Sequence, residues 1–146
     1  MSDQVHVFQK RFAVSTRGRG PQEITDYVAD IVAESGVRTG TVQVFTHHTS
    51  CGLLIGENAD PSVCRDLDRF FGKVAPDGDP MFEHDAEGDD DMPAHVRSVL
   101  TGVSLGIPVS DGRAALGTWQ GIFVWEHRTV PHERRVTVTV TGLRGG

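Results

Sequence analysis

The chain has 146 residues, with 20 acidic and 14 basic side chains, a formal net charge of −6 at pH 7 and 38% hydrophobic residues. This length and composition suit one domain that buries a core without disulfides, and they argue against disorder, a membrane span and general nucleic-acid binding. We therefore expect a single domain over residues 1–146, with no nucleic acid and no membrane among its partners. Two cysteines and a first segment without the layout of a signal peptide lead us to expect a cytoplasmic protein.

The acidic charge is concentrated in one segment. Residues 77–91 hold eight of the twenty carboxylates and no lysine or arginine, so the rest of the chain is slightly basic. Three interpretations stay open for this segment: a solvated loop, a set of carboxylates that binds magnesium or orients a histidine, and a lid over a site.

The first half of the chain predicts alternating strands and helices. Residues 5–14 read as a strand, and Pro21 is expected to open a helix that ends at Gly36. Residues 41–46 and 52–57 then read as two further strands, the second more buried than the first.

A second helix is predicted from Asp60 as N-cap and Pro61 as first residue, with Phe70 and Phe71 expected in the core. A short third helix is expected from about Asp91 to Gly102. The last third predicts strands, expected at residues 104–109, 121–127 and 135–141. We expect an α+β fold: a single compact domain with a mixed or antiparallel β-sheet and two or three helices.

Four of the seven histidines stand at the ends of predicted elements or in the acidic segment, near carboxylates: His48, His84, His95 and His127. Neutral imidazole and carboxylate together suit a divalent cation, and zinc if histidines dominate. The spacing contains no known zinc motif, so each histidine taken alone is better explained by a structural or solvent-exposed role, and only the four together favour ligation. A nucleophilic pair of Cys51 and His48 is a further alternative.

The strand before residue 128 places Glu126 and Arg128 on one face and His127 on the other. This division suggests a site at a boundary between subunits.

Several ordered motifs carry a family resemblance over essentially the whole chain. They are His48-Thr49-Ser50, Glu57-Asn58 with Asp60-Pro61, Glu83-His84-Asp85, Glu87-Gly88, Asp90-Asp91-Met92-Pro93 with His95, Gly117 to Ile122, and Glu126-His127-Arg128. In these motifs the chain resembles the YjbQ-like family. The resemblance implies a compact α+β fold assembled as a homotrimer, and a secondary thiamine-phosphate synthase activity.

That activity would be a condensation of small phosphorylated heterocycles, in which a thiazole-phosphate nitrogen attacks the methylene of a pyrimidine pyrophosphate. The resemblance implies a metal site at His48, His95 and His127, with His84 and Glu126 either handling protons or supporting the ligands from behind. It also implies substrate binding by six residues: Ser50, Asn58, Arg113, Thr118, Gln120 and Arg128. Magnesium would serve the pyrophosphate, and zinc would suit the histidines.

Two other functions remain open beside the synthase. One is a non-catalytic trimer that binds a metal or small anion, and the other is a metal-dependent hydrolase. Basic residues converging on a pocket and an open coordination position would favour an enzyme, whereas closed coordination would favour a structural ion.

Overall fold

A computed structural model describes residues 4–145 as two antiparallel sheets and three helices. The larger sheet has the strand order β1 (Val5–Ser15), β8 (Glu133–Leu143), β3 (Thr39–Thr46), β5 (Ser104–Ser110) and β6 (Arg113–Ala114). The smaller sheet has the order β2 (Gly20–Glu23), β7 (Gln120–Glu126) and β4 (Cys51–Glu57). The helices are α1 (Thr25–Ser35), α2 (Pro61–Val74) and α3 (Asp91–Thr101). The expected single α+β domain is confirmed, with antiparallel sheets and three helices.

The core lies between the larger sheet, α1 and the smaller sheet, which adds Leu53, Ile122 and Val124. Alternate valines of β8 are buried and face the same side as alternate valines of β3, because Val42 pairs with Val140 and Val44 with Val138. Helix α1 covers this side through Val28 and other apolar residues one turn apart, and it ends at Gly36 with a φ of 71°, as predicted.

The expected helix start at Pro21 is wrong. Pro21 lies in β2, opposite Trp125 of β7, and α1 begins only at Thr25. Because β2 is an edge strand, a proline in it does not interrupt the hydrogen bonding of a central strand. The local sequence does not distinguish this position from the first turn of a helix, since the deciding partner is about a hundred residues away.

Helix α2 begins as predicted, with the Asp60 carboxylate accepting a hydrogen bond from the backbone N–H of Ser62 at 2.9 Å. Of its two neighbouring phenylalanines only Phe71 is buried, edge-to-face against Trp125 at 5.5 Å between ring centroids. Phe70 was also expected in the core, but its side chain is 60% exposed. The helix therefore contacts the smaller sheet along a narrow line.

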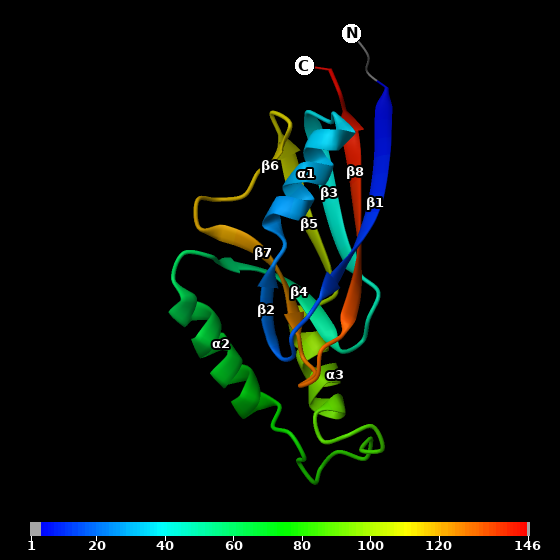
Figure 1. Ribbon diagram of the computed structural model, residues 1–146. Coiled ribbons are helices and arrows are strands. Elements are labelled where there is room, and N and C mark those ends of the chain that lie inside the picture. Colours follow the sequence, from blue (N-terminus) through cyan, green and yellow to red (C-terminus); the bar gives the residue numbers. More distant parts are fainter. Residues whose placement is uncertain (1–3, 146) are drawn as a thin grey trace.

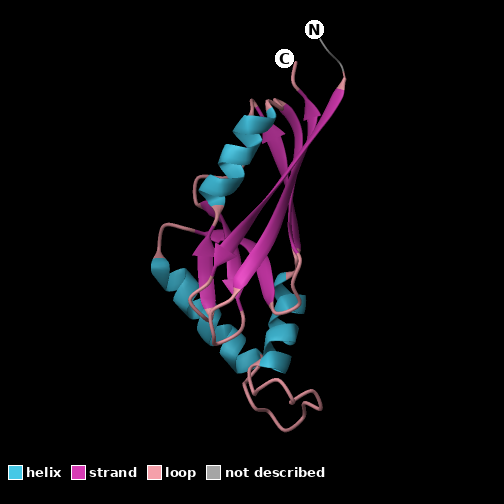
Figure 2. Ribbon diagram, turned by 45° about the vertical axis from the view of Figure 1, so that its right-hand side comes forward, coloured by secondary structure: helices cyan, strands magenta, loops and turns pink. Residues whose placement is uncertain are grey.

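The helices divide between the two ends of the molecule. Figure 1 shows α1 near the end where the two termini lie, with α2, α3 and the loop between them at the opposite end. The turned view in Figure 2 shows the same division, with the loop 75–90 beyond the tips of α2 and α3. None of the helices within residues 4–145 is long and apolar enough to cross a membrane.

Candidate functional site

Three side chains at the start of α3 form a group that can hold a metal ion. His84 comes from the acidic loop, and Asp91 and His95 lie one turn apart on α3. The Asp91 Oδ2 atom is 2.7 Å from Nε2 of His84 and 3.4 Å from Nε2 of His95, and all three ligand atoms lie within 4.8 Å of one another. Asp91 is 3% exposed, whereas His84 and His95 are 49% and 33% exposed, so the group opens to the surface.

Arg128 holds the carboxylates of this group in place. Its Nη1 is 3.0 Å from Oδ1 of Asp91, its Nε is 2.9 Å from Oδ2 of Asp90, and its Nη2 donates to the carbonyl of Glu87. Burial acts to raise the pKa of Asp90, but the hydrogen bonds from Arg128 and the Thr129 N–H, together with the Arg128 charge, outweigh it and the pKa falls to about 2. For Asp91 burial is likewise outweighed, by the His84 hydrogen bond and the Arg128 charge, so its pKa is lowered. Both groups are therefore carboxylates at neutral pH, and Arg128 is engaged with protein oxygens.

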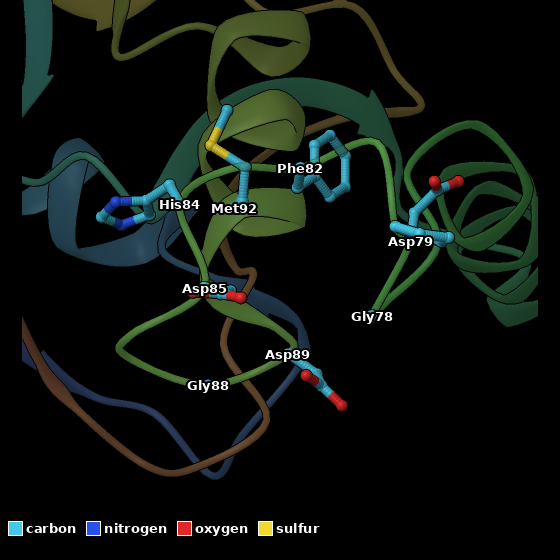
Figure 3. A pocket seen from close by; sticks show the side chains of 9 residues that line it. Gly78, Asp79, Phe82, His84, Asp85, Gly88, Asp89 and Met92 are labelled. Atoms are coloured by element: carbon cyan, nitrogen blue, oxygen red, sulfur yellow. The ribbon is translucent and has the colours of Figure 1, made fainter.

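The loop before α3 encloses a small cavity of about 160 Å³ beside His84, which we call the acidic hollow. Figure 3 shows the labelled side chains of Asp79, Asp85 and Asp89 around it, together with His84 and the apolar Phe82 and Met92. The loop closes through the Gly78 N–H, which donates to the carbonyl of Asp89. The carboxylates around the acidic hollow make the electrostatic potential negative on the His84 side of the group.

A second cavity of about 400 Å³ lies beside His95, and we call it the apolar hollow. It is lined by His48, Thr49, His95, Ser98, Val99, Gly102 and Val103. The structure thus places His48 and His95 around one hollow, but His48 is not part of the metal-competent group found in residues 4–145. Its Nε2 accepts a hydrogen bond from the backbone N–H of Arg135 at 2.8 Å. Burial and the charges of Arg134 and Arg135 lower the pKa of His48.

His127, expected as a third metal ligand, has a different environment. Its side chain is fully buried and packs edge-to-face against Phe71 at 6.1 Å, on the side of β7 covered by α2. Burial, and then the charge of Arg97, lower its pKa to about 3, so it is neutral. Arg97 is itself buried at 2% exposure. In the described chain His127 lies outside the His84–Asp91–His95 group.

Glu126 forms a buried ion pair with Arg134. Arg134 donates from Nε at 2.9 Å and also from Nη2, and the Thr16 hydroxyl donates at 2.6 Å. Burial acts to raise the pKa of Glu126, but the hydrogen bonds from Arg134 and Thr16 lower it. Ser50 belongs to the same network, because its hydroxyl accepts from Arg134 at 2.9 Å. Ser50 was expected to bind substrate and Glu126 to handle protons or support the ligands; in the structure both take part in this buried network.

The remaining predicted substrate-binding residues lie toward the other end of β7. Gln120 is the first residue of this seven-residue strand and Arg128 lies two residues after its last, a span of roughly 25 Å. Gln120 accepts from the Gly117 N–H at 2.7 Å, Asn58 donates to Glu23 at 3.3 Å, and Thr118 is exposed in the adjacent loop. Arg113 lies in β6, which Figure 1 shows far from α3. Within one chain the predicted site residues therefore form two separate groups, one near α3 and one toward the start of β7.

The Cys51–His48 nucleophile pair is disfavoured. The Cys51 thiol is fully buried and lies 3.4 Å from the Thr46 hydroxyl, and burial raises its pKa. A buried, protonated thiol is a poor nucleophile.

Sequence reasoning left open that carboxylates of residues 77–91 bind a metal, but it did not single out Asp91 and it gave His84 a different role. A signal was present, because Asp91 and His95 are four residues apart on a predicted helix and so share one face. Three consecutive aspartates obscured it, since nothing local says which of them is buried.

Comparison with known proteins shows that the sequence is similar to the members of one protein family. Residues 10–143 match the family described as UPF0047 protein YjbQ-like. The UPF0047 protein sll1880 of Synechocystis is 47% identical over 134 residues, which cover 92% of this chain and 91% of that protein. The UPF0047 protein YjbQ of Escherichia coli O157:H7 is 41% identical, covering 92% and 98%.

Solved structures agree with this assignment. A YbjQ-like protein of unknown function from Sulfolobus solfataricus superposes with a TM-score of 0.88 at 26% identity, covering 96% of this chain and all of that one. A YjbQ/UPF0047 family protein from Clostridium acetobutylicum gives 0.83 at 38% identity, covering 90% and 98%. The chain therefore belongs to the UPF0047 YjbQ-like family.

Proposed function

We propose that the chain is an enzyme that binds one divalent metal ion at His84, Asp91 and His95 and acts on a small phosphorylated substrate. The observation that carries the proposal is the geometry of this group: two half-exposed imidazoles around one oxygen of a buried, ionised carboxylate. Two histidines and one carboxylate are a common ligand set of catalytic zinc and other divalent ions.

The distances within the group are compatible with a single ion. Two ligands at about 2.0–2.2 Å from a tetrahedral zinc lie roughly 3.3–3.6 Å apart. The separation of Asp91 Oδ2 and His95 Nε2 is 3.4 Å, which lies in this range. The separation of Asp91 Oδ2 and His84 Nε2 is shorter, at 2.7 Å, so His84 would have to move away from Asp91 for both to bind one ion. Three protein ligands leave a position for water or for a substrate oxygen.

The reaction that we propose is the condensation implied by the resemblance. The thiazole nitrogen attacks the pyrimidine methylene, the carbon–oxygen bond breaks, and the diphosphate leaves with the electron pair. This chemistry requires positioning of the two substrates and stabilisation of the leaving group's charge. A divalent ion held by His84, Asp91 and His95 would supply that positive charge, and Arg128 orients Asp91 in this proposal instead of holding phosphate.

Metal-dependent hydrolysis is the second candidate, favoured by the exposure of the two histidines. An ion held by His84, Asp91 and His95 would lower the pKa of bound water toward neutrality and so supply a nucleophile for hydrolysis. The same metal site serves both reactions, so the substrate distinguishes them.

The test begins with the metal. Chelator-treated protein is titrated with Zn²⁺ and with Mg²⁺ by calorimetry, beside His84→Ala, His95→Ala and the control His6→Ala. We expect one ion per chain, lost in the first two variants and kept in the control. Each preparation is then assayed for thiamine phosphate from the two precursors, and for phosphate release from each precursor alone. Absence of metal binding, or equal binding by all four proteins, would refute the proposal. A tightly bound ion without turnover in either assay would make it structural.

A further inference from the structure

The two hollows beside the His84–Asp91–His95 group differ in size and chemistry. The acidic hollow of about 160 Å³ adjoins His84, and Figure 3 shows the carboxylates of Asp79, Asp85 and Asp89 around it. The apolar hollow of about 400 Å³ adjoins His95. A substrate bound at the group can extend to one side or to the other.

Charge argues against the acidic hollow as the place for a phosphorylated substrate. Like charges a few ångströms apart repel, and Arg128, the nearby cation, is already engaged with Asp90 and Asp91. The acidic hollow is also too small for a ring with substituents, since a benzene ring alone fills a cavity of roughly 150 Å³.

The apolar hollow has suitable walls for an uncharged ring. Val99, Gly102 and Val103 give apolar surface, and the Ser98 hydroxyl is satisfied by donating to the carbonyl of Cys51 at 2.8 Å. A volume of about 400 Å³ lies within the usual range of roughly 300–1,000 Å³ for small-molecule sites.

His48 keeps this hollow uncharged. Its Nε2 accepts the Arg135 N–H, so in the neutral ring the proton is on Nδ1. Burial and the neighbouring arginines lower its pKa and favour this neutral form. His95 is shared between the hollow and the metal-competent group, which connects the two directly.

We infer that the apolar hollow between His48 and His95 binds the uncharged ring of a substrate whose phosphate reaches the His84–Asp91–His95 group. The inference rests on the proposed function and adds to it the place where the ring of the phosphorylated substrate binds. It also gives the direction of the bound molecule, with the ring on the His95 side and away from the acidic loop.

The experiment compares two phosphate monoesters that differ only in the apolar group. Methyl phosphate and benzyl phosphate are titrated by calorimetry into the metal-loaded protein and the chelator-treated protein. Burial of one ring in an apolar hollow predicts that benzyl phosphate binds about tenfold tighter than methyl phosphate. The double variant V99S/V103S is expected to bring the ratio close to one without changing metal affinity or methyl phosphate affinity.

The matched control is Leu100→Ser. Leu100 is a neighbour of Val99 on α3 and is exposed, but it does not line the hollow. This control is expected to keep the tenfold ratio. Equal affinity for the two esters in metal-loaded wild-type protein overturns the inference while leaving the metal site intact, and so does an unchanged ratio in V99S/V103S.

Two further outcomes are decisive. If the protein binds no metal but still prefers benzyl phosphate through Val99 and Val103, the proposed function fails and the hollow is supported. If V99S/V103S instead changes the molar mass in light scattering and leaves the ester ratio unchanged, the hollow is a contact between copies of the chain and the inference fails.

Discussion

Arg128 and Asp91 are joined at 3.0 Å between Nη1 and Oδ1, so the guanidinium takes one carboxylate oxygen and leaves the other, Oδ2, to His84 and His95. The pairing fixes the rotation of a carboxylate that is 3% exposed. It also joins the end of β7 to the start of α3, two segments almost forty residues apart in sequence.

Replacing Arg128 by glutamine is therefore expected to weaken metal binding without removing a ligand. Groups that orient a ligand typically change metal affinity by about 10–100-fold. Arg128→Lys is expected to recover part of the loss, since lysine keeps the charge but not the planar fork that contacts Asp90 and Asp91 together. Zinc titration by calorimetry gives the measurement.

Arg113→Gln is the control, because Arg113 lies in β6 at the other end of the molecule. Circular dichroism establishes that each variant folds. A zinc affinity in Arg128→Gln equal to that of the wild type would show that Asp91 needs no orientation by Arg128.

Substitution of Glu126 distinguishes a structural role of this residue from a role in proton handling. Removing the charge of Glu126 leaves Arg134 buried at 4% exposure without its carboxylate, and breaking such a pair costs about 3–5 kcal/mol. Glu126→Gln is expected to lower the free energy of unfolding by about this amount, as measured by urea denaturation. The exposed Glu133→Gln is expected to leave it within about 0.5 kcal/mol.

The double variant E126Q/R134M identifies the cause. Because it removes both charges, it is expected to be more stable than Glu126→Gln alone. Wild-type stability in Glu126→Gln, combined with lost activity, would instead support direct proton transfer by Glu126.

The sequence predicts elements well where the signal is local. Asp60-Pro61 marks the start of α2, and Gly36 marks the end of α1, because capping depends on residues that are adjacent in the chain. Pro21 could not be placed, since its conformation depends on pairing with Trp125. The same distinction, between signals from adjacent residues and contacts between distant ones, applies to the site.

His84 and His95 are identifiable from the sequence as candidates, but their partner Asp91 is not separable from Asp89 and Asp90 by local pattern. His127 matches a family motif and has carboxylate neighbours, yet the chain buries it beneath α2. Burial is a property of packing between distant elements, and a linear pattern reports it only through periodicity. That periodicity is lost in β7, where residues 121–127 are buried on both faces.

His127 makes the stability of the protein depend on pH. Its pKa is about 3 when folded and near 6.5 when unfolded, so between these values the unfolded chain binds the extra proton. Stability is therefore complete above about pH 6.5 and falls as the pH decreases toward 3. At pH 5 the loss from this one residue is expected to be about 2 kcal/mol relative to pH 7.

Urea denaturation at pH 7 and pH 5 measures this loss, with His127→Leu as comparison. The carboxylates with lowered pKa values, such as Asp90, lose their contribution mainly below about pH 4, so pH 5 separates the two effects. The variant is expected to lose about 2 kcal/mol less than the wild type between the two pH values. An equal loss in both proteins would mean that His127 is protonated in the folded state.

The two phenylalanines of α2 give a matched pair for its attachment to the smaller sheet. Phe71 is 8% exposed and contacts the rings of Trp125 and His127, whereas Phe70 is 60% exposed. Phe71→Ala is expected to destabilise the protein by about 3–5 kcal/mol, because it removes a buried aromatic ring and leaves a cavity against Trp125. Phe70→Ala, on the same helix with the same change in composition, is expected to cost less than about 1 kcal/mol. Thermal and urea denaturation of the two variants give the comparison. Similar losses in both would mean that Phe70 is buried in solution, which requires a contact that the single chain does not provide.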